Sequence, residues 1–290
     1  MESVITGTTQ LLGVIGYPIE HSLSPIMHNA AIAHLEVDCV YLPFLVRPEQ
    51  LGEAVNGLAA IGVRGFNVTI PHKQMIMRLL SDVSPLAQAV GAVNTVWRQD
   101  DRWHGTNTDV TGFLAPLRSL PRDWSKTDVV ILGNGGAARA VVAGCAELGC
   151  GKIRVFGRDR HKLDQFHQSW EKSPLAVTLE TQTWDVLPEY FPTAGLVVNT
   201  TPIGMYPQVY QLPVAPELIN LLEPGAIAYD LIYTPNPTRF LQRAKHQGAT
   251  AIDGLEMLVQ QGAAALEIWL DQTPPVDVMR RSLRQHLGLH

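Results

Sequence analysis

Short apolar segments alternate with longer amphipathic segments along the chain. Segments 11–16, 38–46 and 65–71 are rich in β-branched and aromatic residues, which is typical of strands. Segment 48–62 begins with a proline, has apolar residues at helical spacing and ends with a glycine, which predicts a helix connecting two strands. This alternation predicts an α/β protein whose strands are mostly parallel.

The pattern changes near residue 110, where we place a domain boundary. From residue 128 onward, strand-like and helical segments follow one another in the order of a doubly wound nucleotide-binding domain. The tail is predicted to form two helices separated by Pro274 and Pro275. Because 290 residues exceed what one hydrophobic core usually organises, two domains are expected.

Composition narrows the class of ligand. The 27 acidic and 22 basic residues give a formal charge of -5 without charged runs, which argues against a nucleic-acid or anionic-membrane surface. No apolar segment approaches the ~18 residues of a membrane span, and the first residues lack a signal-peptide pattern. The 3 cysteines form no CxxC pair, and the cysteines and histidines lack metal-site spacing. We therefore expect a cytoplasmic protein that binds a small molecule and no metal.

A glycine-rich turn is the first candidate for a cofactor site. The segment between a predicted strand and a predicted helix consists of Gly133, Asn134, Gly135, Gly136, Ala137 and Ala138. Where side chains are missing, backbone N–H groups can approach a pyrophosphate at the helix N-terminus, although a tight turn without a ligand is an alternative. The order of strand, turn, helix and second strand favours a dinucleotide.

The residues after the next predicted strand bear on the choice between NADP and NAD. Arg158 ends this strand, where NAD-binding proteins usually have an acid that binds the ribose 2′-hydroxyl. An arginine suits a 2′-phosphate, so NADP is favoured as the cofactor. Asp159 would either repel that phosphate or accept a hydrogen bond from a 2′-hydroxyl, and Lys162 offsets its charge only in part.

Two serines are candidates for holding an anionic substrate. Ser22 and Ser24 precede Pro25 at a predicted helix start. Their hydroxyls either receive a carboxylate at the positive end of the helix or cap the helix, with the proline at its first position. On spacing alone the capping role is favoured, and the two serines can differ.

Further candidates for substrate binding follow a strand end. Asn67, Thr69 and Lys73 lie at the end of a predicted strand and in the turn after it, where ligand sites of α/β proteins usually lie. Asn94 and Asp109 lie in similar short polar segments. Each of these residues has an ordinary alternative as a turn or surface residue.

Seven motifs, taken in chain order, resemble those of the shikimate dehydrogenase family. They are GYPIEHSLSPIMHN, NVTIPHK, GAVNT, GTNTD, GNGGAARA, NTTPIGM and DGLEMLVQQ. The resemblance implies reversible, NADPH-dependent reduction of 3-dehydroshikimate to shikimate, a step of chorismate and aromatic amino acid biosynthesis. It also implies a catalytic domain made of residues 1–109 plus 254–290 around an inserted NADP-binding Rossmann domain, residues 110–253.

The resemblance also implies a role for each motif residue. Ser22 and Ser24 would hold the substrate carboxylate, and its hydroxyls would be bound by Thr69, Asn94, Asp109, Tyr233 and Gln261. Lys73 would donate a proton to the developing alkoxide in reduction and accept it in oxidation, while Asp109 holds the lysine. The nicotinamide half of NADP would be lined by Thr200, Pro202, Gly204, Met205, Leu231, Gly254 and Met257, for which packing is the alternative.

Other functions are weighed against this one. A quinate/shikimate dehydrogenase would tolerate NAD, which Asp159 favours because the family's usual NRT sequence is replaced here by Gly157, Arg158 and Asp159. A non-catalytic shikimate or nucleotide sensor would bind without turnover, but the presence of Lys73 and Asp109 argues against it. A methylene-folate or glutamyl-tRNA reductase is disfavoured by the paired serines and the negative charge. The sequence leaves both monomer and homodimer open.

Overall fold

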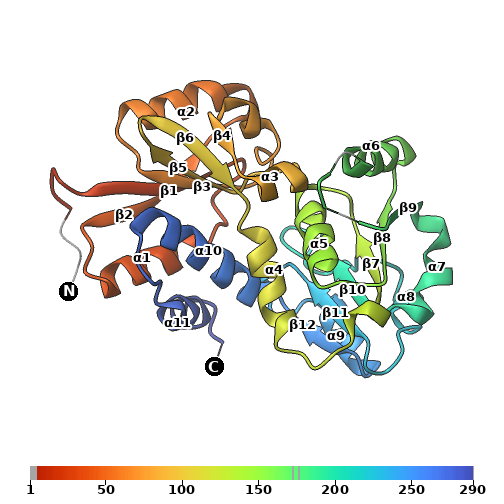
Figure 1. Cartoon of the computed structure of the whole chain (residues 1–290). Coiled ribbons are helices and arrows are strands. Elements are labelled where there is room, and N and C mark those ends of the chain that lie inside the picture. Colours follow the sequence, from red (N-terminus) through yellow and green to blue (C-terminus); the bar gives the residue numbers. More distant parts are fainter. Residues whose placement is uncertain (1–4, 172, 176, 290) are drawn as a thin grey trace. The chain divides into compact units, whose positions relative to one another are not determined.

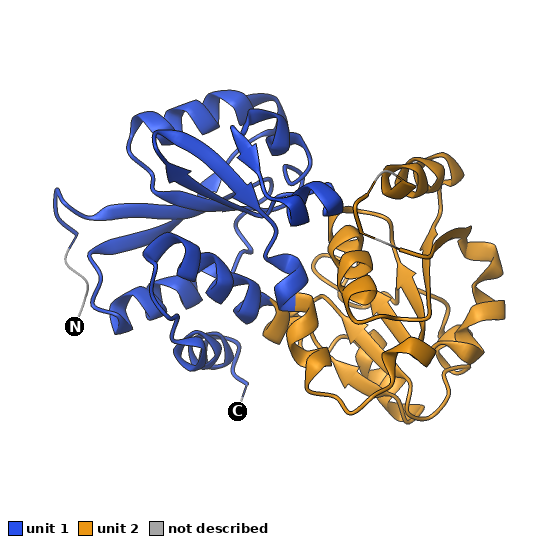
Figure 2. Cartoon of the chain, in the orientation of Figure 1, with its two compact units in different colours: residues 1–112, 258–290 blue, residues 113–257 orange. Residues whose placement is uncertain are grey.

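The chain divides into two compact units. The computed structural model describes residues 5–171, 173–175 and 177–289. Unit 1 is Met1–Gly112 with Leu258–His290, and unit 2 is Phe113–Met257 (Figure 2). The unit boundaries fall inside two helices, α4 (Asp109–Arg118) and α10 (Leu255–Leu270). Each unit contains one sheet, so the predicted α/β class is confirmed.

Unit 1 is built on a six-stranded mixed sheet, in the order β2-β1-β3-β5-β6-β4 (Figure 1). The strands are β1 (Gln10–Gly16), β2 (Cys39–Leu45), β3 (Gly65–Val68), β4 (Asp82–Val83), β5 (Thr95–Gln99) and β6 (Arg102–Thr106). The other helices are α1 (Ser24–His34), η1 (Pro48–Gln50), α2 (Leu51–Ala60), η2 (Met75–Leu79), α3 (Pro85–Val90) and α11 (Val276–His286). Figure 1 shows α1, α10 and α11 on one face of this sheet and α2 on the other.

The strand pairing in unit 1 departs from the parallel expectation at β5. β1 pairs in parallel with β2 and β3, but β5 runs antiparallel to both β3 and β6. The turn between β5 and β6 holds Asp100 and Asp101 at φ of 50° and 59°. Two successive residues with positive φ make the tight turn that matches the twist of a hairpin, so the two strands fold back on each other.

The core of unit 1 follows from the sequence pattern. β1 is the second strand of the sheet and has five consecutive buried residues, as expected for a strand covered on both faces. In α2, Leu51, Val55 and Leu58 are buried at helical spacing, so the predicted helix 48–62 forms as η1 followed by α2. From α10, the buried Trp269 donates a hydrogen bond from Nε1 to the carbonyl oxygen of Val96 at 2.9 Å. The C-terminal helices are therefore part of the unit 1 core.

Unit 2 is built on a six-stranded sheet in which every pair is parallel, in the order β12-β11-β10-β7-β8-β9. The strands are β7 (Asp128–Leu132), β8 (Lys152–Gly157), β9 (Leu179–Thr183), β10 (Leu196–Asn199), β11 (Ile227–Asp230) and β12 (Thr250–Ile252). The other helices are η3 (Trp124–Lys126), α5 (Gly136–Glu147), α6 (Arg160–Glu171), η4 (Trp184–Val186), α7 (Leu187–Tyr190), η5 (Phe191–Thr193), α8 (Pro216–Ile219) and α9 (Arg239–His246).

The strand order of unit 2 fixes where a ligand would bind. Counted from β7, the order is 3-2-1-4-5-6, which is that of the dinucleotide-binding doubly wound fold. The order reverses between β7 and β10, and ligands of such sheets bind beyond the carboxyl ends of the strands at this point. The predicted glycine-rich turn directly follows β7, and the Thr200 segment directly follows β10. The predicted Rossmann-type unit is thus confirmed.

Among the described residues, no helix combines the length and the apolar composition that crossing a bilayer requires.

We predict that Gly65→Ala destabilises unit 1. A Cβ on Gly65 would lie 2.2 Å from Nε1 of the buried Trp269 and 2.8 Å from the carbonyl oxygen of Val96, so the tryptophan must move. Overpacking of this kind costs about 1–3 kcal/mol. The control is Gly57→Ala in α2, where a Cβ meets nothing within 4 Å and helix propensity is expected to stabilise slightly. Thermal unfolding should show a lower midpoint only for Gly65→Ala, and equal midpoints in both variants would contradict the packing described here.

Candidate active site

The first feature of unit 1 is a close ion pair between Lys73 and Asp109. Lys73 lies in the turn after β3, and Asp109 is the first residue of α4. The Nζ atom of Lys73 donates to Oδ2 of Asp109 at 2.6 Å, and the two side chains are 19% and 7% exposed. The backbone carbonyl of Lys73 also accepts a hydrogen bond from Val93 N at 2.8 Å. The ammonium group is therefore held in a fixed place while part of the lysine stays accessible.

Asn94 links this pair to the C-terminal helix. Its Nδ2 atom donates to Oδ1 of Asp109 at 2.8 Å and lies 3.4 Å from Oε1 of Gln261. Its Oδ1 atom accepts from the backbone N–H of Thr108 at 2.7 Å. Four of the predicted substrate or catalytic residues, each from a different motif of the sequence, thus form one hydrogen-bonded network.

Asn67 lies behind this network. Its Oδ1 atom accepts a hydrogen bond from the Tyr41 hydroxyl at 2.7 Å. Its Nδ2 atom donates to the Asn94 carbonyl at 3.1 Å and to Oγ1 of Thr95 at 3.2 Å. Both N–H donors of the Asn67 amide are therefore used inside the protein, where they fix the backbone of Asn94.

Neither Ser22 nor Ser24 is the N-cap residue of α1. The helix begins at Ser24, its N-cap position is Leu23, and no side chain caps it. The capping alternative is therefore wrong, and Pro25 is the second helical residue rather than the first, because the helix starts one residue earlier than the proline indicates. The Ser24 hydroxyl hydrogen-bonds with Tyr41. Ser22 accepts a long hydrogen bond of 3.4 Å from the backbone of Ser24.

The remaining predicted substrate residues lie in different units. Thr69 is half-buried at the end of β3, and its backbone N–H donates to the Ile15 carbonyl at 3.0 Å. Tyr233 is half-buried in the segment after β11, in unit 2. The structure brings Thr69 to the same end of β3 as Lys73, whereas Tyr233 belongs to the unit that contains the predicted cofactor residues.

The glycine-rich turn of unit 2 has the features of an anion site. Gly133 has a φ of +103°, and a Cβ on it would lie 2.8 Å from Oγ1 of Thr200. The turn leads into α5, whose N-terminus has no side-chain cap and no acidic residue in its first turn. The backbone N–H groups and the positive end of the helix dipole are thus left for a negatively charged ligand. These residues fit the pyrophosphate of a dinucleotide.

The Thr200 segment contacts this turn from the neighbouring strand. The Thr200 hydroxyl donates to the carbonyl oxygen of Leu132 at 2.7 Å, which fixes it beside Gly133. Among the residues predicted to line the nicotinamide, Gly204 has a φ of +109° and Met205 is 37% exposed. Met257 in α10 is buried. Pro202 lies in the same loop as Gly204 and Met205.

Asp159 has a structural task that the sequence did not reveal. Its Oδ1 atom accepts a hydrogen bond from the backbone N–H of Lys162 at 3.2 Å, and its carbonyl accepts from Leu163 N at 3.1 Å. It therefore caps α6, which begins at the next residue. Arg158 is exposed, and among the described residues it has no hydrogen bond or ion pair. Its guanidinium is thus available to an incoming phosphate.

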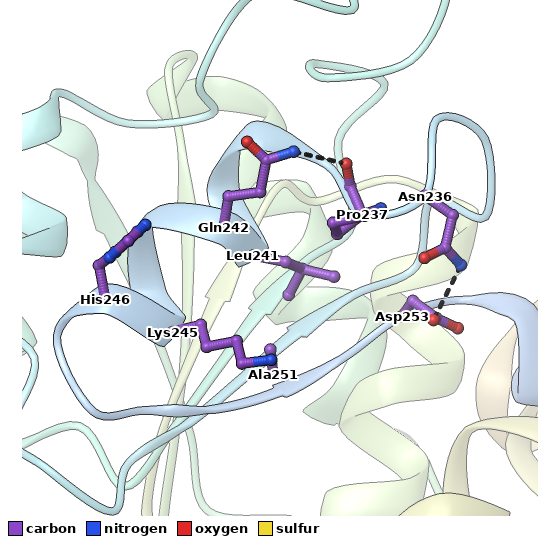
Figure 3. Close-up of a pocket in the computed structure, with 8 residues that line it drawn as sticks. All are labelled: Asn236, Pro237, Leu241, Gln242, Lys245, His246, Ala251 and Asp253. Carbon is purple, nitrogen blue, oxygen red and sulfur yellow. Dashed lines mark hydrogen bonds between the residues drawn. The ribbon is translucent and has the colours of Figure 1, made fainter.

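A hollow of unit 2 lies away from these positions. It has a volume of about 770 Å³ and lies between α9 and β12, lined by Leu241, Lys245 and Asp253 among others (Figure 3). Figure 3 shows Asn236 hydrogen-bonded to Asp253 at its rim, at 2.8 Å. Because β12 is the edge strand, the hollow is four strands from β8 and contains none of the predicted cofactor residues. This hollow therefore does not mark the predicted cofactor site.

In the described part of the chain, no group of three or more His, Cys, Asp or Glu side chains is placed to hold a metal ion.

Comparison with protein families gives matches near both ends of the chain. Residues 14–96 match the family described as the shikimate dehydrogenase substrate binding domain. Residues 254–284 match the family described as the shikimate 5′-dehydrogenase C-terminal domain. The first range covers the strands and turns that carry Ser22 to Asn94, and the second covers Gln261.

Similarity to whole proteins is extensive. A curated shikimate dehydrogenase (NADP+) of Trichormus variabilis is 62% identical over 288 residues, which span 99% of this chain and 100% of the relative. One of Synechocystis is 56% identical over 283 residues, which span 98% of each. The chain belongs to the shikimate dehydrogenase family. The resemblance inferred from the seven motifs is confirmed.

Solved structures of shikimate dehydrogenases also share the fold. The Aquifex aeolicus protein aligns with a TM-score of 0.87 and 36% identity, covering 97% of this chain and 100% of that one. The Thermus thermophilus protein, solved in complex with NADP(H) and shikimate, aligns with a TM-score of 0.83 and 33% identity, covering 95% of this chain and 99% of that one.

In this shikimate dehydrogenase family member, two further residues support the loops that are predicted to line the nicotinamide. Asn199 ends β10 and donates from Nδ2 to Oδ1 of Asp230, which ends β11, at 2.9 Å. Asp230 also accepts hydrogen bonds from Thr238 Oγ1 at 2.7 Å and from Ile232 N at 3.2 Å. Burial raises the pKa of Asp230 to about 6, against the lowering effect of these donors. The pair holds two loops at the strand ends. The available sequence signal was Asn199 as the first residue of NTTPIGM and Asp230 directly after AIAY.

Tyr41 and His28 were also missed, because each looks like an ordinary core residue in the sequence. Tyr41 on β2 is fully buried and donates to Asn67, as described above. The His28 ring stacks on the Tyr41 ring, with centroids 4.2 Å apart and planes 10° apart. Neither nitrogen of His28 has a hydrogen-bond partner within the described residues. In this family member, the neutral His28 thus packs against Tyr41, which hydrogen-bonds to Asn67.

We predict that His28 makes unit 1 less stable in acid. Burial lowers the pKa of His28 to about 3 from an ordinary value of 6.5. Below about pH 6.5 the unfolded chain therefore binds a proton at His28, whereas the folded chain does not. The free energy of unfolding thus falls as the pH falls from about 6.5 towards 3. At pH 5 the loss is about 2 kcal/mol relative to pH 7. His28→Phe, which keeps a stacking ring, should remove this part of the pH dependence.

Thermal unfolding from pH 7 to pH 5 checks this, with His34→Gln as the control. His34 lies in the same helix but is exposed. The unfolding midpoint of His28→Phe should fall less than that of the parent and of the control. Parallel curves for all three proteins would show that His28 is protonated in the folded state.

Proposed function

We propose that this chain catalyses the reversible, NADPH-dependent reduction of 3-dehydroshikimate to shikimate. The observation that carries the proposal is the contact between Lys73 and Asp109 inside the network of Asn94 and Gln261. Reduction of a ketone needs a proton for the oxygen, and a partly exposed ammonium held by a buried carboxylate supplies a positioned donor. The names of the relatives at 56–62% identity support the same reaction.

In this proposal Lys73 donates and accepts the proton of the reacting oxygen. During reduction, its ammonium group donates a hydrogen bond and then the proton to the ketone oxygen as that oxygen becomes an alkoxide. In the reverse direction, its neutral amine accepts the proton of the shikimate hydroxyl. Asp109 holds Nζ through Oδ2, and Asn94 fixes the other carboxylate oxygen, so the lysine cannot turn away.

Substrate recognition is assigned to the polar residues around this pair. Ser22 and Ser24 are assigned to the carboxylate because they lie at the start of α1, where no N-cap side chain occupies the positive end of the helix. The ring hydroxyls are bound by Thr69, Asn94, Asp109, Gln261 and Tyr233. Asn67 acts as a positioning residue through the backbone of Asn94.

The residues of unit 2 fit NADP. The turn from Gly133 to Ala138, including Asn134, Gly135, Gly136 and Ala137, would receive the pyrophosphate. Arg158 would bind the 2′-phosphate, with Lys162 adding positive charge. When bound, NADPH supplies the hydride that adds to the ketone carbon. Thr200, Pro202, Gly204, Met205, Leu231, Gly254 and Met257 would orient the nicotinamide half.

The other functions are not favoured. The chain matches the curated NADP+-dependent shikimate dehydrogenases over 97–100% of its length and theirs. Capping of α6 occupies Asp159, so the feature that favoured NAD tolerance has a structural explanation. A 5-ketofructose reductase aligns with a TM-score of 0.83 at 32% identity, so the fold also serves another ketone. A cytoplasmic location and a monomeric or homodimeric state complete the proposal.

We predict that Lys73→Ala lowers kcat by about 10²–10⁴ with little change in the KM for shikimate, because the lysine acts mainly in the transition state. Initial rates of NADPH formation measure this. The control is Lys126→Ala, since Lys126 is an exposed lysine paired with Asp123 at 3.2 Å. A Lys73→Ala protein with the kcat of the parent would rule out the assignment.

We predict that Arg158→Ala weakens the preference for NADP. Loss of a charged hydrogen bond to phosphate costs about 1.5–3 kcal/mol, or roughly a 10- to 100-fold lower kcat/KM with NADP+. The kcat/KM with NAD+ should stay within about twofold because NAD+ lacks the phosphate. Arg160→Ala is the control, since Arg160 pairs with Asp164 at 3.0 Å. An equal loss with both cofactors would assign Arg158 a structural role instead.

A further inference from the structure

Two cysteines occupy defined positions at the end of α5. The helix is followed by Leu148 and then by Gly149, which has a φ of +73°. The backbone N–H of Cys150 donates to the carbonyl of Cys145 at 3.0 Å, and that of Gly149 donates to the carbonyl of Ala146 at 3.0 Å. This pair of hydrogen bonds defines a Schellman motif. In such motifs the side chains at the positions of Cys145 and Cys150 frequently contact each other. Here both side chains are thiols.

The backbone geometry places the two thiols next to each other, since Cys150 N donates to the Cys145 carbonyl at 3.0 Å. The two thiols lie close enough for each to shift the pKa of the other. The chain after Cys150 is held as well, because Gly151 N donates to the carbonyl of Thr127 at 3.2 Å. A Cβ on Gly151 would lie 2.6 Å from the carbonyl oxygen of Ser125, so the backbone here packs tightly. The fold thus holds the backbone of both cysteines in place, which keeps their side chains side by side at the end of α5.

The two thiols have unequal environments. Cys145 is fully buried, and burial raises the pKa of its thiol well above the ordinary value. Cys150 is half-buried. The hydrogen bond from Cys145, and to a lesser extent the charge of Arg122, lowers the pKa of the Cys150 thiol against the effect of its partial burial. Cys150 is therefore the accessible, more acidic sulfur, and Cys145 is the protected one behind it.

We propose that Cys145 and Cys150 form a redox-active dithiol that reacts with small-molecule disulfides to give a reversible intrachain disulfide. The Cys150 thiolate attacks one sulfur of the reagent, breaks its S–S bond and releases one thiolate, which leaves a mixed disulfide. The Cys145 sulfur then attacks the Cys150 sulfur, releases the second thiolate and loses its proton to it. The two protein thiols are oxidised by two electrons and the reagent is reduced to two thiols. A dithiol reductant reverses both steps.

The chain offers a direct readout of this reaction. Cleavage after Arg139 and Lys152 releases one peptide, residues 140–152, that contains both cysteines, while Cys39 lies in another. The reduced full-length protein is incubated with glutathione disulfide, its remaining thiols are alkylated, and the peptides are weighed. We expect peptide 140–152 to lose two hydrogens and to carry neither alkyl group nor glutathione, and Cys39 to be alkylated.

Variants separate the two steps. Cys145→Ala should retain one glutathione on Cys150, because no second thiol can displace it, and Cys150→Ser should leave Cys145 unmodified. Cys39→Ser is the matched control and should oxidise as the parent does. The readout is the state of the thiols, so a change in catalytic rate is not required. Two alkylated cysteines in peptide 140–152 of the parent, or glutathione stably retained on Cys150 of the parent, would overturn the proposal.

Discussion

The buried carboxylate of Asp109 is the charge on which the hydrogen-bonded network of unit 1 depends. One oxygen accepts from Lys73 and the other from Asn94, and the side chain is only 7% exposed. A buried carboxylate is stable only when its oxygens have donors, so the lysine and the asparagine are both required by the same charge. Asn94 is in turn fixed by Asn67 and by the backbone of Thr108. The position of the Lys73 ammonium group thus follows from the need of the buried Asp109 carboxylate for hydrogen-bond donors.

A comparable constraint acts in unit 2, at the carboxyl ends of its strands. An all-parallel sheet with its order reversed between β7 and β10 separates the loops at that point, which leaves room for a ligand beyond the strand ends. The close approach of Thr200 to Gly133 excludes a side chain at the glycine, and the uncapped end of α5 supplies N–H groups. These features suit an anion without any basic residue in the turn itself. In the proposed function, the 2′-phosphate is bound by the exposed Arg158.

The sequence predicted those parts of the fold that depend on local pattern. The alternation of strands and helices, the glycine turn and the helical tail were all predicted from neighbouring residues. The antiparallel hairpin was not predicted. It depends on positive φ at Asp100 and Asp101, and the amino-acid types alone do not distinguish such a turn from an ordinary polar loop. Ser24 as the first residue of α1, and the capping of α6 by Asp159, were likewise decided by backbone geometry.

Tyr41 and its contact with Asn67 were missed for a different reason. Tyr41 on β2 and Asn67 on β3 meet because both strands flank β1, with Tyr41 opposite Leu12 and Asn67 opposite Val14. Such a contact depends on strand order, which no local pattern contains. Gln261 was found only through the family motif, since it reaches Asn94 across 167 positions of sequence.

In the proposed function, the charge of Asp109 acts through Lys73 in the reduction of a ketone to shikimate. NADPH formation from shikimate and NADP+ should therefore be measured for the purified chain and for Asp109→Asn, which keeps the shape of the side chain but removes its charge. We expect turnover by the parent and a loss of about 10²-fold or more in kcat for the variant. Equal turnover of variant and parent would rule out this role of Asp109, and a parent that binds shikimate without forming NADPH would rule out the proposed reaction.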